Sequence, residues 1–269
     1  MVWRAFIMDT FDIHGFIILL FCLIDECTGE LEQHFNAKLH PSEIVTLALL
    51  KRMSGKAYRR FLVWLRTTKL FPKLPDYTRL CRLFHQYEPV IEVFSKQLGS
   101  LPIDWAVLDS VHCEVIHPIR EGRKTKWVGK NKSKGRWVVG MKVVAVVSPR
   151  GDILEWNLDT SNIHDTHFAW IVEDFNVKVL ADTGFHSKNG DPENLKICKR
   201  GEQNERMVVE SVFSLLKRLL GLNQIQAKTR AGFELAVSSI FALFNFLLEM
   251  NRRLGLATKK PSIAHYFCL

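Results

Sequence analysis

Two stretches of this sequence end on an aspartate, and together they decide the fold that we expect. They are "DWAVLDS" at residues 104–110 and "NVKVLADTG" at residues 176–184. Both are rich in β-branched and aliphatic residues, so they are predicted to be strands. Strands this apolar lie centrally in a covered sheet. Asp109 and Asp182 are therefore expected at the C-terminal ends of two central strands.

Other segments after residue 101 alternate between strand and helix patterns. Three more strands are predicted, at residues 137–148, 151–159 and 194–198. The segment 165–175 is expected to be a helix capped by Asp165. Two further helices are expected at residues 204–221 and from about residue 231 to 253. This order predicts an α/β fold, a mixed sheet with flanking helices.

The first hundred residues are predicted to be helical. Two short helices face each other across a Pro-rich turn, one at residues 56–68 and one that begins near Asp76. Because the second carries Arg79 and Arg82, the pair could form a helix-turn-helix that binds DNA. A small helical bundle with solvated arginines is the alternative.

Composition indicates a globular protein with a polyanionic partner. The 269 residues are 47% hydrophobic and 24% charged, and the net charge is +9. Nucleic acid is the first candidate partner, and an anionic membrane surface is the second. The six cysteines form no CxxC pair, which argues against a disulfide framework or zinc ribbon and favours a reducing compartment.

Two apolar runs are candidates for membrane segments. Residues 16–24 are too few to span a bilayer and lack the features of a signal peptide, and residues 235–248 suit a buried core helix. We therefore expect no membrane association.

Asp109 and Asp182 are the first candidates for a functional site. If their strands are neighbours, the carboxylates lie a few ångströms apart, and their mutual repulsion calls for a cation. Oxygen ligands without His or Cys suit Mg²⁺ or Mn²⁺ better than zinc. A third carboxylate from a helix across the sheet would complete a two-metal site for phosphoryl transfer. Taken alone, an aspartate after a strand is a common turn residue.

The helix at residues 204–221 carries a candidate for that third carboxylate. At about 100° per residue its apolar side chains form one broad arc, and Arg206, Glu210 and Lys217 fall within roughly 40° of one another along its border. Arg206 and Glu210 could simply form an ion pair four residues apart. The two strand-end aspartates favour the other interpretation, in which Glu210 is a metal ligand.

Three blocks in this order resemble the Asp-Asp-Glu signature of insertion-sequence transposases, which have a ribonuclease-H-like catalytic core. They are "VLDS" (107–110), "ADTGF" (181–185) and "RMVVESVFSLLK" (206–217), and the last matches the family's pattern of Arg, three residues, Glu, six residues and Lys. "TSNIHD" (160–165) resembles the family's Asn-x-His-Asp segment. "LFPKLPDYTRLCRL" (70–83) resembles the N-terminal segment of the group named for insertion sequence 982.

The resemblance implies a metal-dependent DNA transposase with Asp109, Asp182 and Glu210 as its acidic triad, holding two Mg²⁺ or Mn²⁺ ions. It implies a helical N-terminal domain in residues 1–100 and a ribonuclease-H-like catalytic domain in residues 101–269. The expected partners are transposon ends and target DNA, handled by a homodimer or larger synaptic assembly, and the implied location is cytoplasmic and nucleoid-associated in a prokaryote. A nuclease of the same fold without strand transfer, or a catalytically silent DNA-binding descendant, is the alternative.

Basic residues gather in two places that are candidates for DNA contact. Residues 120–136 contain eight Lys or Arg and one acid, which predicts a phosphate-contacting loop, although a solvated hairpin tip is the alternative. On the later helix, Arg206 and Lys217 are expected to contact DNA, although Lys217 could instead pair with Glu210. The basic side chains of the first segment are Arg120, Arg123, Lys124, Lys126, Lys130, Lys132, Lys134 and Arg136.

Overall fold

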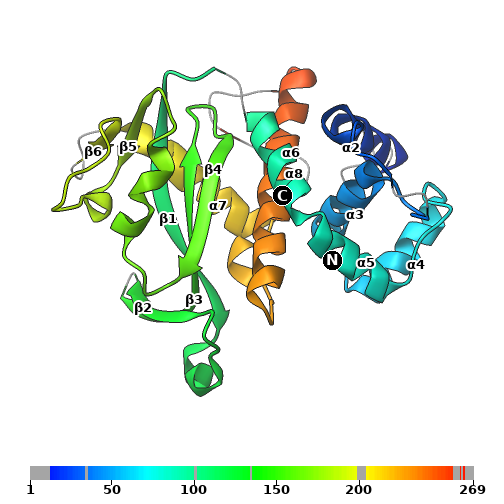
Figure 1. The fold of residues 1–269 in the computed structure, drawn as a ribbon, viewed down its shortest axis with the longest axis horizontal. Helices are drawn as coiled ribbons and strands as arrows, with labels where there is room; N and C mark the ends of the chain where they lie inside the picture. The colour runs from blue at the N-terminus through cyan, green and yellow to red at the C-terminus, as the bar shows by residue number, and fades with distance from the viewer. Residues whose placement is uncertain are drawn as a thin grey trace.

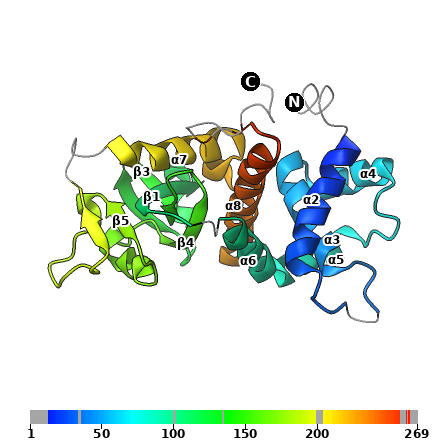
Figure 2. The same cartoon turned by 90° about the horizontal axis from the view of Figure 1, so that it is seen from above.

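The computed structural model describes residues 13–33, 36–99, 102–133, 135–198, 204–256, 261 and 263. A mixed sheet lies at one end of the molecule and a group of helices at the other, with the long helix α8 (Arg230–Arg253) between them (Figure 1). The same arrangement is seen from above in Figure 2.

The sheet follows the order β2-β3-β1-β5-β6, and β4 also pairs with β3. β3 is antiparallel to β1, β2 and β4, whereas β5 is parallel to both β1 and β6. This mixed arrangement is consistent with a ribonuclease-H-like transposase fold. The bounds are β1 (Trp105–Ile116), β2 (Gly129–Ser133), β3 (Arg136–Val147), β4 (Ile153–Thr160), β5 (Lys178–Ala181) and β6 (Leu195–Ile197).

One of the two predicted central strands is longer than its apolar run. β1 continues to Ile116, so Asp109 lies inside the strand. The prediction that Asp109 ends the strand is therefore wrong. β3 pairs with β1 over the whole of this length, from Val107 opposite Val147 to Ile116 opposite Val139. The second half of β1 alternates polar and apolar residues. The prediction relied on the continuous apolar run before Asp109, so it did not include this half.

Different elements cover the two faces of the sheet. Val107, Val111 and Cys113 of β1 belong to the same hydrophobic cluster as the buried side of α7 (Met207–Leu219). Ala106 and Leu108 instead pack with Phe168 and Phe185, which lie in the 3-10 helices η2 (Asp165–Val172) and η3 (Thr183–Phe185). Because strand residues alternate between faces, Asp109 is on the α7 face.

The helix expected at residues 165–175 differs from the prediction in two respects. It is the 3-10 helix η2, and its N-cap is His164, whose side chain accepts a hydrogen bond from the backbone N–H of Thr166. Asp165 is therefore not the cap, and its carboxylate is available for other contacts.

The N-terminal region is helical in the described residues, as predicted. The C-terminal helix α8 packs against α3, α5 and α6 of this region as well as against β4. By length and composition α8 could span a membrane, but 78% of its most apolar window is buried inside the protein, as in a core helix. The bounds are α2 (Ile13–Thr28), α3 (Pro41–Ser54), α4 (Tyr58–Thr68), α5 (Tyr77–Gln86) and α6 (Glu88–Gly99).

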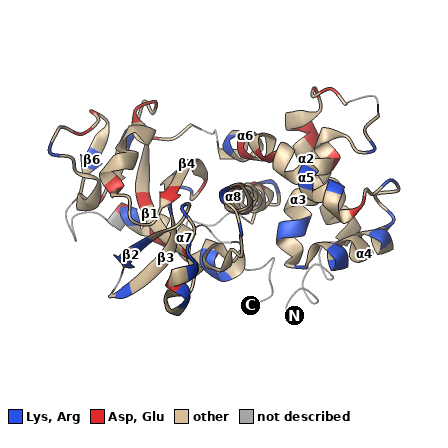
Figure 3. Cartoon of the chain, turned by 60° about the horizontal axis from the view of Figure 1, so that its bottom comes forward, with Lys and Arg blue, Asp and Glu red and all other residues tan. Residues whose placement is uncertain are grey.

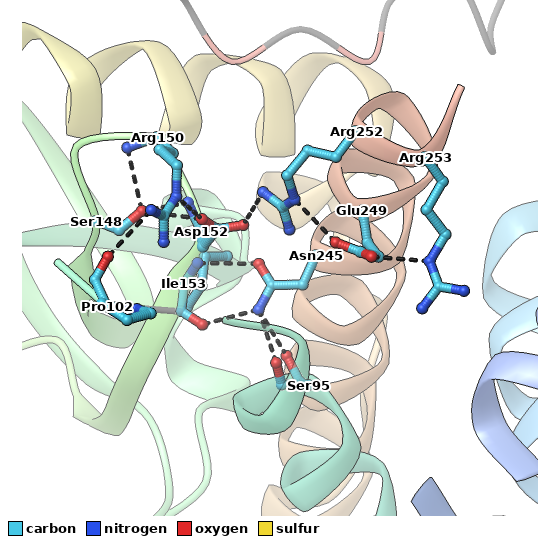
Figure 4. A network of polar contacts seen from close by, with 10 residues as sticks. All are labelled: Ser95, Pro102, Ser148, Arg150, Asp152, Ile153, Asn245, Glu249, Arg252 and Arg253. Atoms are coloured by element: carbon cyan, nitrogen blue, oxygen red, sulfur yellow. Dashed lines mark hydrogen bonds and ion pairs between the residues drawn. The ribbon is translucent and has the colours of Figure 1, made fainter. Parts of the chain in front are cut away.

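A buried asparagine on α8 joins the helical region to the sheet (Figure 4). Asn245 accepts a hydrogen bond from the N–H of Ile153 at 2.9 Å and donates to its carbonyl oxygen at 2.8 Å. Its amide also donates to the carbonyl oxygen of Ser95 on α6 at 2.9 Å. Nearby, the buried Asp152 pairs with Arg252 at 2.8 Å. One side chain therefore satisfies the backbone where β4 begins.

Replacing Asn245 with alanine is expected to destabilise the protein by about 2–4 kcal/mol, because buried backbone groups of Ile153 and Ser95 would lose their partners. Urea unfolding monitored by circular dichroism measures the change. Asn223→Ala makes the same chemical change at an exposed position and should cost less than about 0.5 kcal/mol. Equal stability of the two variants would contradict this role of Asn245.

Candidate active site

Asp109 and Asp182 lie side by side in the sheet. The parallel register places Trp105 opposite Lys178 and Val107 opposite Leu180. Continued by two residues, the same register puts Asp109 level with Asp182, which directly follows β5. The condition left open by the sequence, that the two strands are neighbours, is met, because β1 and β5 pair directly.

Each of these carboxylates is held by nearby groups. Asp109 accepts a hydrogen bond from the N–H of Ser110 at 2.7 Å. Asp182 is the N-cap of η3 and accepts from the N–H of Gly184 at 2.8 Å. The other oxygen of Asp182 lies 3.7 Å from Nη2 of Arg206, which immediately precedes α7. Asp182 is thus fixed between a backbone amide and a loosely paired guanidinium.

Burial and neighbouring charges disfavour the ionised form of Asp109. Burial raises the pKa of Asp109 to about 6, and the neighbouring carboxylates of Asp182 and Asp165 raise it as well. The Ser110 N–H and the Arg206 guanidinium oppose this rise. Burial is therefore the main reason that the ionised form of Asp109 is disfavoured, and the two neighbouring carboxylates add to it.

Asp165 is the member of this cluster that sequence reasoning missed. A Cβ built on Gly184 would lie 2.9 Å from Oδ1 of Asp182 and 3.2 Å from Oδ2 of Asp165, so the two carboxylates flank the same glycine. Oδ1 of Asp165 pairs with the buried Lys142 at 2.9 Å. Two features of the sequence could have indicated this pair: the "NIHD" segment, which ends in Asp165, and Lys142, the single lysine inside the apolar run "VVGMKVVAVV".

Glu210 is on the correct helix but is not gathered with the aspartates. It lies one turn after Arg206 on α7, the helix that covers the Asp109 face, and its side chain is exposed. Among the described residues, no group of three or more His, Cys, Asp or Glu is placed to hold a metal ion. The assignment of Glu210 to the triad therefore stays a prediction.

The two cations of the α7 segment lie at different positions along β1. Arg206 lies next to Asp182, whereas Lys217 lies beside Cys113. Burial raises the pKa of Cys113 to about 12, and the charge of Lys217 opposes this rise. The helix therefore runs along β1, with Glu210 between its two cations in sequence.

The predicted basic segment forms an arm that projects from the sheet. It comprises the 3-10 helix η1 (Pro118–Arg123), a connecting coil, β2 and the start of β3. Figure 3 shows Lys and Arg on β2 and the adjoining arm. Lys124, Lys126 and Lys130 line an open hollow of about 570 Å³ together with Asn162. We call residues 118–136 the basic arm.

Two cations of the basic arm are held in ion pairs, one with an acid of the arm and one with an acid of β1. Lys130 pairs with Glu121 at 2.5 Å and lies 4.7 Å from the ring centroid of Trp137. Arg136 pairs with Glu114 at 2.6 Å. Arg120, Arg123, Lys124 and Lys126 are exposed, Lys132 lies on β2, and Lys134 lies outside the described residues.

Comparison with known proteins links the chain to a transposase domain. A family model described as "Transposase DDE domain" matches residues 104–204. The matched region includes Asp109, Asp165 and Asp182 but ends before Glu210. No curated protein matches the chain. The match covers less than half of the chain, and it shows that this segment is similar to a transposase domain of the DDE type.

Asp109→Asn is expected to stabilise the metal-free protein at about pH 7 by on the order of 1–2 kcal/mol, after allowance for partial exposure of the side chain. The pKa of Asp109 is raised in the folded protein, so its ionised form destabilises the fold above about pH 6. This destabilisation disappears as the pH falls toward 3.8, the ordinary value for Asp. The substitution keeps an oxygen to accept from Ser110.

Urea unfolding in the presence of a chelator, at about pH 7 and about pH 4, measures this effect. The increase in the free energy of unfolding of Asp109→Asn over wild type should be largest at neutral pH and should vanish at about pH 4. Asp104→Asn removes an exposed carboxylate just before the same strand and should change neither value. A loss of stability in Asp109→Asn at neutral pH would contradict the electrostatic picture.

Proposed function

We propose that this protein is a DNA transposase of the insertion-sequence type, related to the group named for insertion sequence 982. It would cleave phosphodiester bonds at transposon ends and join those ends to target DNA. The observation that carries the proposal is the position of Asp109 beside Asp182, within the segment that matches a transposase DDE domain.

The donor set is suited to a hard divalent cation. Adjacent carboxylates with a raised pKa at Asp109, and only a loosely placed guanidinium nearby, would gain from added positive charge. In the proposal Asp109, Asp182 and Glu210 hold two Mg²⁺ or Mn²⁺ ions, which would supply charge neutralisation and activation of the attacking water. Glu210 would reach the site from its exposed position on α7.

The protein's own residues position the carboxylates and the DNA for two successive reactions. Gly184 and Arg206 hold Asp182 in place next to Asp109. Hydrolysis of a phosphodiester at the transposon end would release a 3′-hydroxyl. This hydroxyl would then attack a phosphodiester of the target DNA, forming the new bond and displacing the 3′-hydroxyl of the cut target strand. Arg206 and Lys217, on the helix beside the aspartates, would contact the DNA strand that enters the site.

Two further surfaces are proposed to bind DNA. The basic arm is one, since it follows directly after β1, the strand that carries Asp109, and exposes Arg120, Arg123, Lys124 and Lys126. The other is α5, which exposes Arg79, Arg82 and Gln86 along one side. The connection from α4 to α5, Lys69 to Asp76, is longer than the usual helix-turn-helix turn of about 3–4 residues.

Bringing two transposon ends together would require a homodimer or a larger assembly, in the cytoplasm.

Alanine at Asp109, Asp182 or Glu210 is expected to reduce Mg²⁺-dependent cleavage of transposon-end DNA to background, because each removes a proposed ligand. DNA binding, measured by fluorescence anisotropy, should remain largely intact. Glu205→Ala is the matched control, since Glu205 is also an exposed acid close to the start of α7.

Full cleavage by Glu210→Ala would remove Glu210 from the triad. A strand-transfer assay with a labelled target duplex separates the proposed transposase from its nuclease alternative, since only the transposase gives joined products. No cleavage by the wild-type protein with Mg²⁺ or Mn²⁺ would favour the silent DNA-binding descendant.

Lys126→Ala is expected to lower the slope of log K against log salt concentration by about 0.9 for duplex DNA, because one phosphate contact is lost. Binding at several salt concentrations measures this slope. Lys178→Ala removes an exposed lysine at the start of β5, the end opposite Asp182, and should leave the slope unchanged. Equal slopes for Lys126→Ala and wild type would exclude a phosphate contact at this position.

A further inference from the structure

A buried lysine occupies the middle of β3, on the sheet face covered by η2. Lys142 is only 3% exposed. Its ammonium donates a hydrogen bond to the carbonyl oxygen of Ile163 at 2.6 Å and lies 2.9 Å from Oδ1 of Asp165. A buried ammonium is costly unless it is paired, and an apolar side chain would fill this position at lower cost. The pair therefore calls for an explanation beyond packing.

Asp165 is the carboxylate that balances this lysine. Two other polar residues lie opposite Lys142 in the sheet, His112 on β1 and Asp159 on β4. Burial and the charge of Lys142 lower the pKa of His112, so the imidazole stays neutral at neutral pH. Asp159 lies 4.0 Å from Arg230. Lys142 thus binds one oxygen of Asp165 and anchors the start of η2 on the sheet.

The other oxygen of Asp165 lies toward Asp182, one of the proposed metal ligands. Gly184 lies between Oδ2 of Asp165 and Oδ1 of Asp182, and the absence of a side chain at Gly184 permits this approach. The 3-10 helices η2 and η3, which carry Asp165 and follow Asp182, pack against each other. One carboxylate therefore connects the buried lysine with the Asp182 turn.

We propose that Asp165 is a positioning residue of the acidic site, held by Lys142, and that its carboxylate strengthens divalent-cation binding at Asp109 and Asp182. This inference rests on the proposed function, since it assumes that these two aspartates bind a cation. Groups behind the direct ligands commonly change metal affinity by about 10–100-fold when they are removed.

The test compares Mn²⁺ binding by the full-length protein and its variants, measured by isothermal titration calorimetry. The decisive variant is Lys142→Gln with Asp165→Asn, which removes both charges and leaves no unpaired ion in the core. Its Kd for Mn²⁺ is expected to rise about tenfold. Asp165→Asn alone should bind at least as weakly, because Lys142 is then a nearby uncompensated cation. Glu173→Gln, at the other end of η2, is the matched control and should bind as wild type.

A comparison with Asp182→Asn separates the two levels of the proposal. If Asp182→Asn binds Mn²⁺ more weakly and the double variant binds it about tenfold more weakly than wild type, the inference is supported. If Asp182→Asn loses affinity and the double variant binds as wild type, Asp165 and Lys142 serve the fold alone and the inference is wrong. If neither change weakens binding, the proposed metal site is wrong, and the inference falls with it.

Discussion

The parallel pairing of β1 with β5 is the constraint on which the candidate site depends. It is short, joining Trp105–Val107 of β1 to Lys178–Leu180 of β5, yet it puts Asp109 level with Asp182. Burial of Asp109 and the nearby like charge of Asp182 both disfavour its ionised form, and together they raise its pKa. The surrounding structure must therefore hold the two strands together against the repulsion. Such an arrangement is what a cation-binding site requires.

The rest of the fold supplies that support from both faces of the sheet. On one face α7 packs against Val107 and Val111 of β1 and brings Arg206 to Asp182. On the other face, Lys142 fixes Asp165 and hence the start of η2. At the far end of the sheet, Asn245 of α8 ties β4 to α6. The C-terminal helix is therefore part of both the helical region and the support of the sheet.

The sequence allowed much of this structure to be predicted because its strands and helices carry clear local patterns. Asp109, Asp182 and the helix of Glu210 were found in this way. Contacts that depend on long-range packing were not. Asp165 approaches Asp182 only through the packing of η2 on η3, and Lys142 reaches Asp165 from β3, 23 residues earlier in the sequence. The length of β1 was missed for a related reason, since its second half is extended by pairing with β3.

The central claim is that Asp109 and Asp182 jointly bind a divalent cation. Anomalous X-ray diffraction from crystals grown with Mn²⁺ tests it most directly, because the signal locates manganese without reference to activity. The account predicts an anomalous peak in contact with carboxylate oxygens of both Asp109 and Asp182, with the side chain of Glu210 turned toward it. Manganese bound elsewhere, with no peak touching either aspartate, would contradict it.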